Sequence, residues 1–201
     1  VGQDLLRQEL VDYYKRIFDV DVGLNRVFVT SSGTTAMHLA LTAILDEGDE
    51  VVTVTPIWKN LLMAIELAEA KIKQAALDCD EGKWSLDLDK LFDTCTDQTK
   101  VILINSPSNP TGWTMTHDEI KAVMEFARAR GIWVVSDEVY SRVVYNGQHA
   151  PSFLEVAEPD DLLFVVNSFS KSWAMTGWRL GWLVFFFQAE DGIRDIAVYD
   201  N

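Results

Sequence analysis

The chain has 201 residues, of which 17 are basic and 31 acidic, so its formal net charge at pH 7 is −14. A chain this acidic lacks the positive face that nucleic acids and anionic membranes require, and we expect neither as a partner. The longest apolar run, residues 182–187, is far shorter than the roughly 20 residues of a membrane-spanning helix. Length and composition favour one large globular unit with a sizeable core.

Helix and strand patterns alternate along the chain. In chain order the expected elements are a helix at residues 6–17, a strand at 26–30, a helix at 36–45, a strand at 50–54, a helix at 60–70, a strand at 71–77, a short helix at 86–92, a strand at 101–104, a helix at 116–130, and strands at 132–135 and 162–166. The helix at 116–130 begins with a capping box and ends before Gly131. This alternation predicts an α/β fold, a three-layer sandwich whose central sheet is mainly parallel.

Lys171 lies just past the expected strand at 162–166, in the segment SFSKSWAMTGWRLG of residues 168–181. Serine hydroxyls flank this lysine, and hydroxyls can bind an anion. Partial burial and a neighbouring cation such as Arg179 would lower the pKa of the amine. Lys171 is therefore a candidate nucleophile for Schiff-base chemistry.

Two other strand ends carry polar residues. Asn109 follows the strand at 101–104, and Asp137 and Tyr140 follow the strand at 132–135. Because ligands of open α/β sheets bind at the carboxyl ends of the strands, we expect these side chains to meet Lys171 on one rim.

The segment Ser32-Gly33-Thr34 stands between a strand and a helix, where free backbone N–H groups and the helix dipole can face a phosphate. Taken singly, each of these features has an ordinary explanation. A short Gly-containing turn is weak evidence for phosphate, and residues 109–112 (NPTG) can be a simple turn. Asp137 can be a helix cap, and Tyr140 and Trp58 can be packing residues. Their joint occurrence favours one functional site.

Three segments, residues 109–112 (NPTG), 137–140 (DEVY) and 168–181, resemble in order the signatures of the class I/II aminotransferases. Members of this family have fold type I and use pyridoxal 5′-phosphate. The resemblance covers residues 1–184 and implies part of the large, cofactor-binding domain. It also implies an enzyme that transfers an amino group from an amino acid to a 2-oxo acid through a Schiff base at Lys171.

The resemblance implies a role for each matching residue. Lys171, Asp137 and Tyr140 would be catalytic, and Asp137 would pair with the pyridinium nitrogen of the cofactor. Asn109 and Tyr140 would hydrogen-bond the phenolate oxygen of the cofactor, on whose ring Trp58 would stack. The positions that match the phosphate-binding residues are Ser32, Gly33, Thr34, Ser168, Ser170 and Arg179.

Residues 185–201 resemble no part of the family, and they resemble the translation of sequencing-adapter read-through. We therefore expect a non-native tail. We also expect the chain to lack the N-terminal segment of the family and its C-terminal arginine for the substrate carboxylate, so that this fragment itself is inactive.

Two alternatives stay open at this point. One is a carbon–sulfur lyase of the same fold, and the other is a non-catalytic sensor domain of a transcription regulator. Cys79 and Cys95 have no metal or redox spacing, and the three histidines are scattered, so we expect no metal and a cytoplasmic protein with reduced thiols. The resemblance implies a homodimer, whereas the sequence does not distinguish among amino acid substrates.

Overall fold

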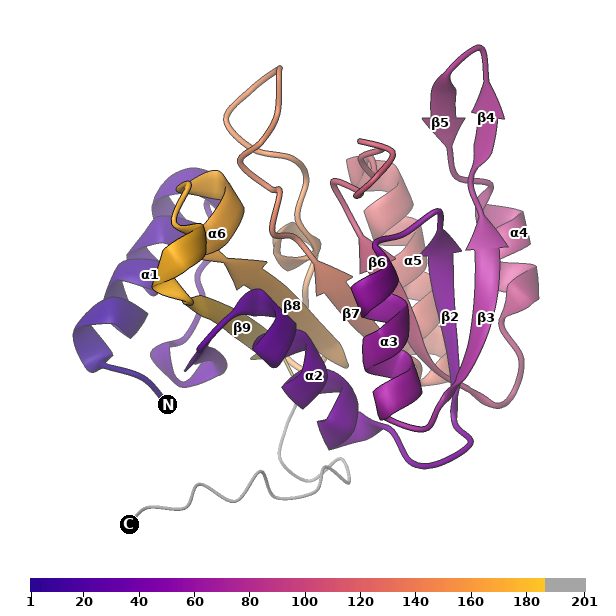
Figure 1. The fold of residues 1–201 in the computed structure, drawn as a ribbon, viewed down its shortest axis with the longest axis horizontal. Coiled ribbons are helices and arrows are strands. Elements are labelled where there is room, and N and C mark those ends of the chain that lie inside the picture. The colour runs from indigo at the N-terminus through magenta and orange to yellow at the C-terminus, as the bar shows by residue number, and fades with distance from the viewer. Residues whose placement is uncertain (187–201) are drawn as a thin grey trace.

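The computed structural model describes residues 1–186. Within them one seven-stranded sheet has the order β1-β9-β8-β7-β6-β2-β3 (Figure 1). Its strands are β1 (Val27–Thr30), β2 (Glu50–Thr55), β3 (Lys71–Ala76), β6 (Thr99–Asn105), β7 (Trp133–Asp137), β8 (Leu163–Ser168) and β9 (Gly181–Phe186). Strand β9 runs antiparallel to β1 and β8, whereas the other adjacent pairs are parallel. The expectation of a mainly parallel sheet is confirmed.

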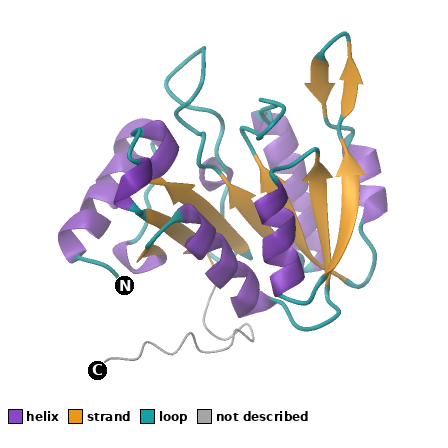
Figure 2. Ribbon diagram, viewed as in Figure 1, coloured by secondary structure: helices purple, strands orange, loops and turns teal. Residues whose placement is uncertain are grey.

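Both faces of the sheet are covered by helices (Figure 2). The helices are α1 (Asp4–Phe18), α2 (Gly33–Ile44), α3 (Lys59–Leu67), α4 (Leu88–Thr94), α5 (His117–Arg130) and the single-turn α6 (Phe169–Ser172). Helices α2 and α3 pack on one face, and α1, α4 and α5 contribute to the core on the other. The three-layer α/β sandwich is therefore confirmed.

Strict alternation along the central strands explains this layering. In β6, Ile102 and Ile104 belong to the core beside α1, α4 and α5, whereas Val101 and Leu103 belong to the core beside α2 and α3. All four are fully buried, as continuous apolar runs in a parallel sheet require. Strand β6 thus contributes to both cores, and its polar residues Thr99, Lys100 and Asn105 lie at its two ends.

Local sequence signals set several helix ends. The capping box of Thr116 and Glu119 is present at the start of α5, and Gly131 ends that helix with φ of 65°. Helix α2 begins three residues before the expected position because the Ser32 side chain accepts a hydrogen bond from the Thr35 N–H. The hairpin of β4 (Asp78–Asp80) and β5 (Lys83–Ser85) was not anticipated, since its strands have only three residues each.

The first two residues of the expected tail lie inside the sheet. Phe185 and Phe186 complete β9, where they pair with Phe164 and Leu163 of β8. The remainder of that tail, residues 187–201, lies outside the described residues. Its interpretation as non-native sequence stays a prediction.

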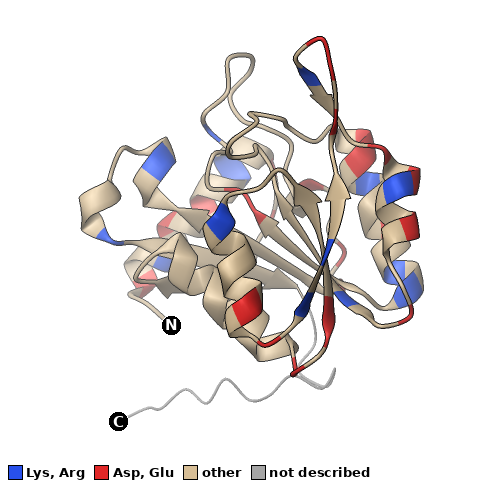
Figure 3. Ribbon diagram, turned by 45° about the vertical axis from the view of Figure 1, so that its right-hand side comes forward, with Lys and Arg blue, Asp and Glu red and all other residues tan. Residues whose placement is uncertain are grey.

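Charged residues are spread over the outer helices and the β4–β5 hairpin, with acidic and basic residues interspersed (Figure 3). This distribution agrees with a sheet that is buried on both faces. Among the described residues, no helix combines the length and apolar character needed to cross a membrane.

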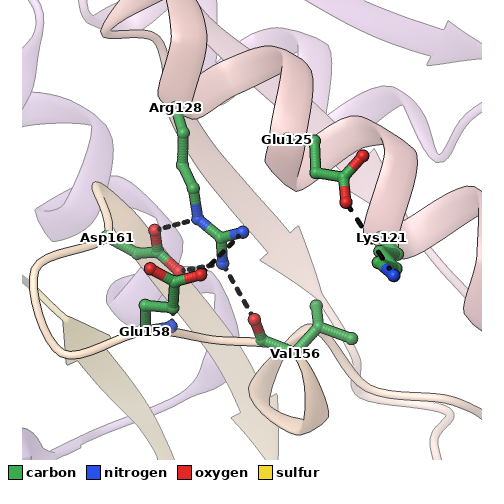
Figure 4. A network of polar contacts seen from close by, with 6 residues as sticks. All are labelled: Lys121, Glu125, Arg128, Val156, Glu158 and Asp161. Carbon is green, nitrogen blue, oxygen red and sulfur yellow. Dashed lines mark hydrogen bonds and ion pairs between the residues drawn. The ribbon is translucent and has the colours of Figure 1, made fainter.

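The segment that precedes β8 is attached to α5 by a guanidinium that binds two carboxylates (Figure 4). Arg128 donates from Nε and Nη2 to the two carboxylate oxygens of Asp161 at 2.6 and 2.8 Å, and Nη2 also donates to the Val156 carbonyl. Glu158 lies 3.2 Å from the same guanidinium, with its side chain exposed. Because Asp161 is buried, this bidentate pairing supplies hydrogen-bond donors that its carboxylate cannot obtain from solvent.

We predict that Arg128→Ala lowers the free energy of unfolding by about 2–3 kcal/mol, since Asp161 would stay buried with only the Glu158 N–H as a remaining partner. Lys121→Ala is the matched control on the same helix, because Lys121 and Glu125 form an exposed pair at 3.9 Å worth less than about 0.5 kcal/mol. Urea denaturation measures both losses. Equal losses for the two variants would contradict the assigned role of Arg128.

Candidate active site

A cavity of about 330 Å³ opens at the carboxyl ends of β7 and β8. Its lining includes nine of the residues expected from the sequence, namely Ser32, Gly33, Thr34, Trp58, Asp137, Ser168, Ser170, Lys171 and Arg179. A larger cavity of about 620 Å³ lies at the opposite end of the sheet, beside Lys100 and Gly131. We place the site in the smaller cavity because the convergent polar groups are there.

One end of the cavity is formed by the start of α2. Ser32 caps this helix, and the N–H groups of the first helical turn have no acceptor within the helix. A Cβ on Gly33 would come within 3.2 Å of the Ser168 Cβ, and a Cβ on Gly181 would collide with the Gly33 nitrogen. Glycine at both positions lets the α2 terminus approach the ends of β8 and β9 closely, which suits a bound phosphate.

Arg179 lies at the same end, exposed, with its Nη1 donating to the Thr176 carbonyl at 3.1 Å. Its φ of 50° is in the left-handed region, a conformation that costs a residue with a Cβ about 1 kcal/mol or more. The backbone therefore holds strain at the position where the guanidinium joins the cavity.

Asp137 also lines the cavity, with 5% of its surface exposed. Burial raises the pKa of its carboxyl to about 7, and a hydrogen bond from the Val139 N–H, at 3.2 Å from Oδ1, opposes this rise. No basic residue of the described chain forms an ion pair with Asp137 within 4.0 Å. A buried carboxylate without a basic partner among the described residues is well suited to bind a cationic group of a ligand, such as a protonated pyridine nitrogen.

Lys171 extends from α6, whose first turn is capped by Ser168. Its Nζ lies 5.8 Å from the centre of the Tyr140 ring. The Lys171 side chain is exposed, in contrast to the partial burial that we expected. The exposure arises because α6 is a single turn at the edge of the fold, so no second layer covers the lysine.

Two expected residues, Asn109 and Tyr140, lie outside the lining of this cavity. Tyr140 borders a neighbouring cavity of about 470 Å³, although its ring stays close to Lys171. Asn109 is tied to the site through Asn105, whose side chain accepts from the Asn109 N–H at 2.8 Å and donates to the Asp137 carbonyl at 3.3 Å. One buried amide therefore joins the two loops.

Sequence reasoning missed several lining residues. Asn60 and Thr176 add polar groups, and the apolar remainder consists of Met37, Leu61, Ala64 and Val139. Asn60 follows the expected strand at 50–54 and lies two residues after Trp58, so its place in the chain was a usable signal. Met37, Leu61 and Ala64 had none, because helical periodicity marks them as core.

The matching family model, Aminotransferase class I and II, covers residues 1–197. This chain belongs to that family. A probable aspartate aminotransferase of Methanocaldococcus jannaschii is 36% identical over 178 residues, covering 89% of this chain and 46% of that protein. An aspartate aminotransferase of Streptomyces avermitilis is 38% identical over 165 residues, covering 82% of this chain and 40% of that protein.

Solved structures agree with this assignment and confirm fold type I. The aspartate aminotransferase of Thermotoga maritima matches with a TM-score of 0.85 and 32% identity, covering 92% of this chain and 48% of that one. An alanine aminotransferase from Pyrococcus furiosus matches with a TM-score of 0.86 and 31% identity, covering 95% of this chain and 48% of that one. The chain thus spans about half the length of its relatives.

We predict that Asp137→Asn stabilises the cofactor-free protein at pH 8 but not at pH 4. The pKa of Asp137 rises from 3.8 to about 7 on folding, so the folded state keeps a proton that the unfolded state releases between about pH 4 and 7. Wild-type stability therefore falls through this window and is flat above it, whereas the asparagine variant avoids this loss, on the order of a few kcal/mol.

Denaturation at a series of pH values measures this difference, and Asp80→Asn on the exposed β4–β5 hairpin is the control. Parallel stability curves for wild type and Asp137→Asn would show that the Asp137 carboxyl is not perturbed.

Proposed function

We propose that the protein containing this chain is a pyridoxal-phosphate-dependent aminotransferase that moves an amino group from an amino acid to a 2-oxo acid. The observation that carries the proposal is the placement of the Asp137 carboxyl, the Lys171 amine and the α2 terminus around one cavity. The Asp137 carboxyl can accept a cation, the Lys171 amine can act as a nucleophile, and the α2 terminus can bind a phosphate. Family membership supports the same reading.

The residues present fit the cofactor. Its phosphate would lie at the α2 terminus, held by Ser32, Gly33, Thr34, Ser168 and Arg179, and Ser170 is within the same lining. Arginine offers two parallel donors to phosphate oxygens. Trp58, half-exposed at the cavity wall, would stack on the ring, and Asn109 and Tyr140 would bind its phenolate oxygen.

When bound, the cofactor supplies an electron sink for the carbanion that forms at the substrate Cα. Asp137, ionised beside the pyridine nitrogen, would keep that nitrogen protonated. Lys171 would hold the cofactor through its Nζ at rest, and once the substrate amine has replaced it there, the released Nζ would accept the proton from the substrate Cα. Its position in a single-turn helix at the cavity rim leaves the amine free to move between these tasks.

The names of the relatives favour transamination over carbon–sulfur cleavage, and they make aspartate the first amino acid to test. The structural neighbours also include an alanine aminotransferase. We therefore propose the reaction class for this chain and treat aspartate as its leading amino donor.

We also propose that the complete protein is a cytoplasmic homodimer. Met63, Leu67 and Trp178 are 50, 70 and 72% exposed, and two of them border a groove that Arg179 shares. Large apolar side chains in such a position favour burial against a second copy. Cys79 and Cys95 form no disulfide, in agreement with a reducing compartment. Sedimentation velocity of the complete protein would show a monomer if the dimer is wrong.

We predict that borohydride reduction in the presence of pyridoxal phosphate labels Lys171 of the complete protein, because its amine is exposed at the cavity. Mass spectrometry of peptides identifies the labelled lysine. Lys171→Ala should lose the label and the spectral half-reaction with aspartate, whereas Lys59→Ala, at the exposed start of α3, should keep both. A label on another lysine would refute the proposed function.

A further inference from the structure

Glu138 is a second buried carboxylate directly after Asp137, with 1% of its surface exposed. Successive side chains at a strand end point to opposite faces of a sheet. Asp137 lines the cavity, whereas the Glu138 carboxylate contacts Ser136, two residues earlier on the other face. Glu138 therefore lies behind the site and does not border the cavity.

The Glu138 carboxylate accepts three hydrogen bonds. Its Oε1 accepts from the Ser136 hydroxyl at 3.1 Å and from the Phe153 N–H at 3.0 Å, and its Oε2 accepts from the Ser152 hydroxyl at 2.7 Å. Ser152 and Phe153 begin a short 3-10 helix, Phe153–Glu155. One side chain thus closes the base of the loop that leaves the sheet at residue 138 and returns at residue 152.

That loop carries groups of the candidate site. Its first turn is closed by the Ser141 N–H, which donates to the Glu138 carbonyl at 2.9 Å. Inside the turn, the Val139 N–H donates to the Asp137 carboxylate, and the Val139 carbonyl accepts from the Ser172 hydroxyl of α6 at 3.3 Å. The turn therefore contacts both the Asp137 carboxylate and the helix that carries Lys171.

We propose that Glu138 is a positioning residue, whose hydrogen bonds to Ser136, Ser152 and Phe153 hold the turn at residues 138–141. The held turn aims the Val139 N–H at the Asp137 carboxylate and keeps the Tyr140 ring beside Lys171. What Asp137 and Tyr140 do with a cofactor rests on the proposed function, whereas the anchoring of the turn does not.

The chemistry of Glu138 agrees with this role. Burial raises the pKa of its carboxyl to about 7, and the hydrogen bonds from Ser152, Phe153 and Ser136 oppose the rise. A buried carboxyl group is costly to keep, and the three donors offset that cost at one place, the base of the loop. Glutamine can keep the Phe153 contact through its carbonyl and donate its amide to the Ser152 hydroxyl, so Glu138→Gln is the conservative variant.

Hydrogen exchange of the complete, cofactor-free protein tests the anchoring. In Glu138→Ala, peptides that cover residues 138–145 should exchange at least about tenfold faster than in wild type, while peptides of α5 are unchanged. Glu138→Gln should stay within about threefold of wild type. Wild-type exchange at residues 138–145 in a folded Glu138→Ala protein would overturn the proposal.

A second pair of variants tests the anchoring of the turn by Glu138 if Glu138→Ala does not fold. Ser152→Ala removes the partner of Oε2, whereas Glu155→Ala removes only the cap of the 3-10 helix, a bond from the Ser152 N–H at 2.7 Å. Exchange at residues 138–145 should rise in Ser152→Ala and not in Glu155→Ala. Equal exchange in the two variants would overturn the role of Glu138.

The absorbance of the bound cofactor provides a measurement that a general loss of packing would not change. With pyridoxal phosphate bound, the pH titration of the cofactor absorbance should shift in Glu138→Ala, because Asp137 and Tyr140 are displaced, and return in Glu138→Gln. An unshifted titration would overturn the link from Glu138 to the site. A wild-type protein that binds no cofactor would instead refute the proposed function, and the exchange result would stand by itself.

Discussion

Burial of the parallel strands on both faces constrains every other part of this structure. Residues of β6, β7 and β8 alternate between two apolar cores, so they have no room for polar side chains along their length. Polar groups can lie only where the strands end, and parallel strands end on the same rim. The candidate site is a consequence of this arrangement, since its residues come from the ends of β7 and β8, from the segments that follow β2 and β8, and from α2 and α3.

The rim holds polar groups that would be costly if they stood alone. Asp137 and Glu138 are both buried carboxyl groups whose pKa is raised to about 7 by burial. They differ in their partners, because Glu138 accepts hydrogen bonds from three protein groups and Asp137 accepts one. A carboxyl group that faces a cavity and has few protein partners is available to a ligand. A carboxyl group whose oxygens are hydrogen-bonded to protein groups instead holds those groups in place.

Cross-links between loops give the site its rigidity. Asn105 connects the loop after β6 to the end of β7, and Ser172 connects α6 to the turn after β7. Asn167 continues this pattern, because its side chain accepts from the Ser168 N–H and donates to the Ser141 hydroxyl. These amide and hydroxyl contacts link the segments around the site, so several of its supports are themselves polar.

The sequence by itself determined the elements and the strand-end motifs, because both depend on residues close together in the chain. Apolar periodicity placed helices α1 to α5 and strands β1, β2, β3, β6, β7 and β8 within a few residues, and the capping box marked the start of α5. The motifs at Asn109, Asp137 and Lys171 indicated the family before any geometry was known.

Only the tertiary structure decided the strand order, the antiparallel insertion of β9 between β1 and β8, and the membership of the cavity. It brought Asn60 and Thr176 into the lining, left Asn109 outside it and showed Lys171 to be exposed. These features depend on contacts between residues far apart in the sequence, whose pairing follows from how the two cores pack against the whole sheet, and local patterns carry no record of that packing.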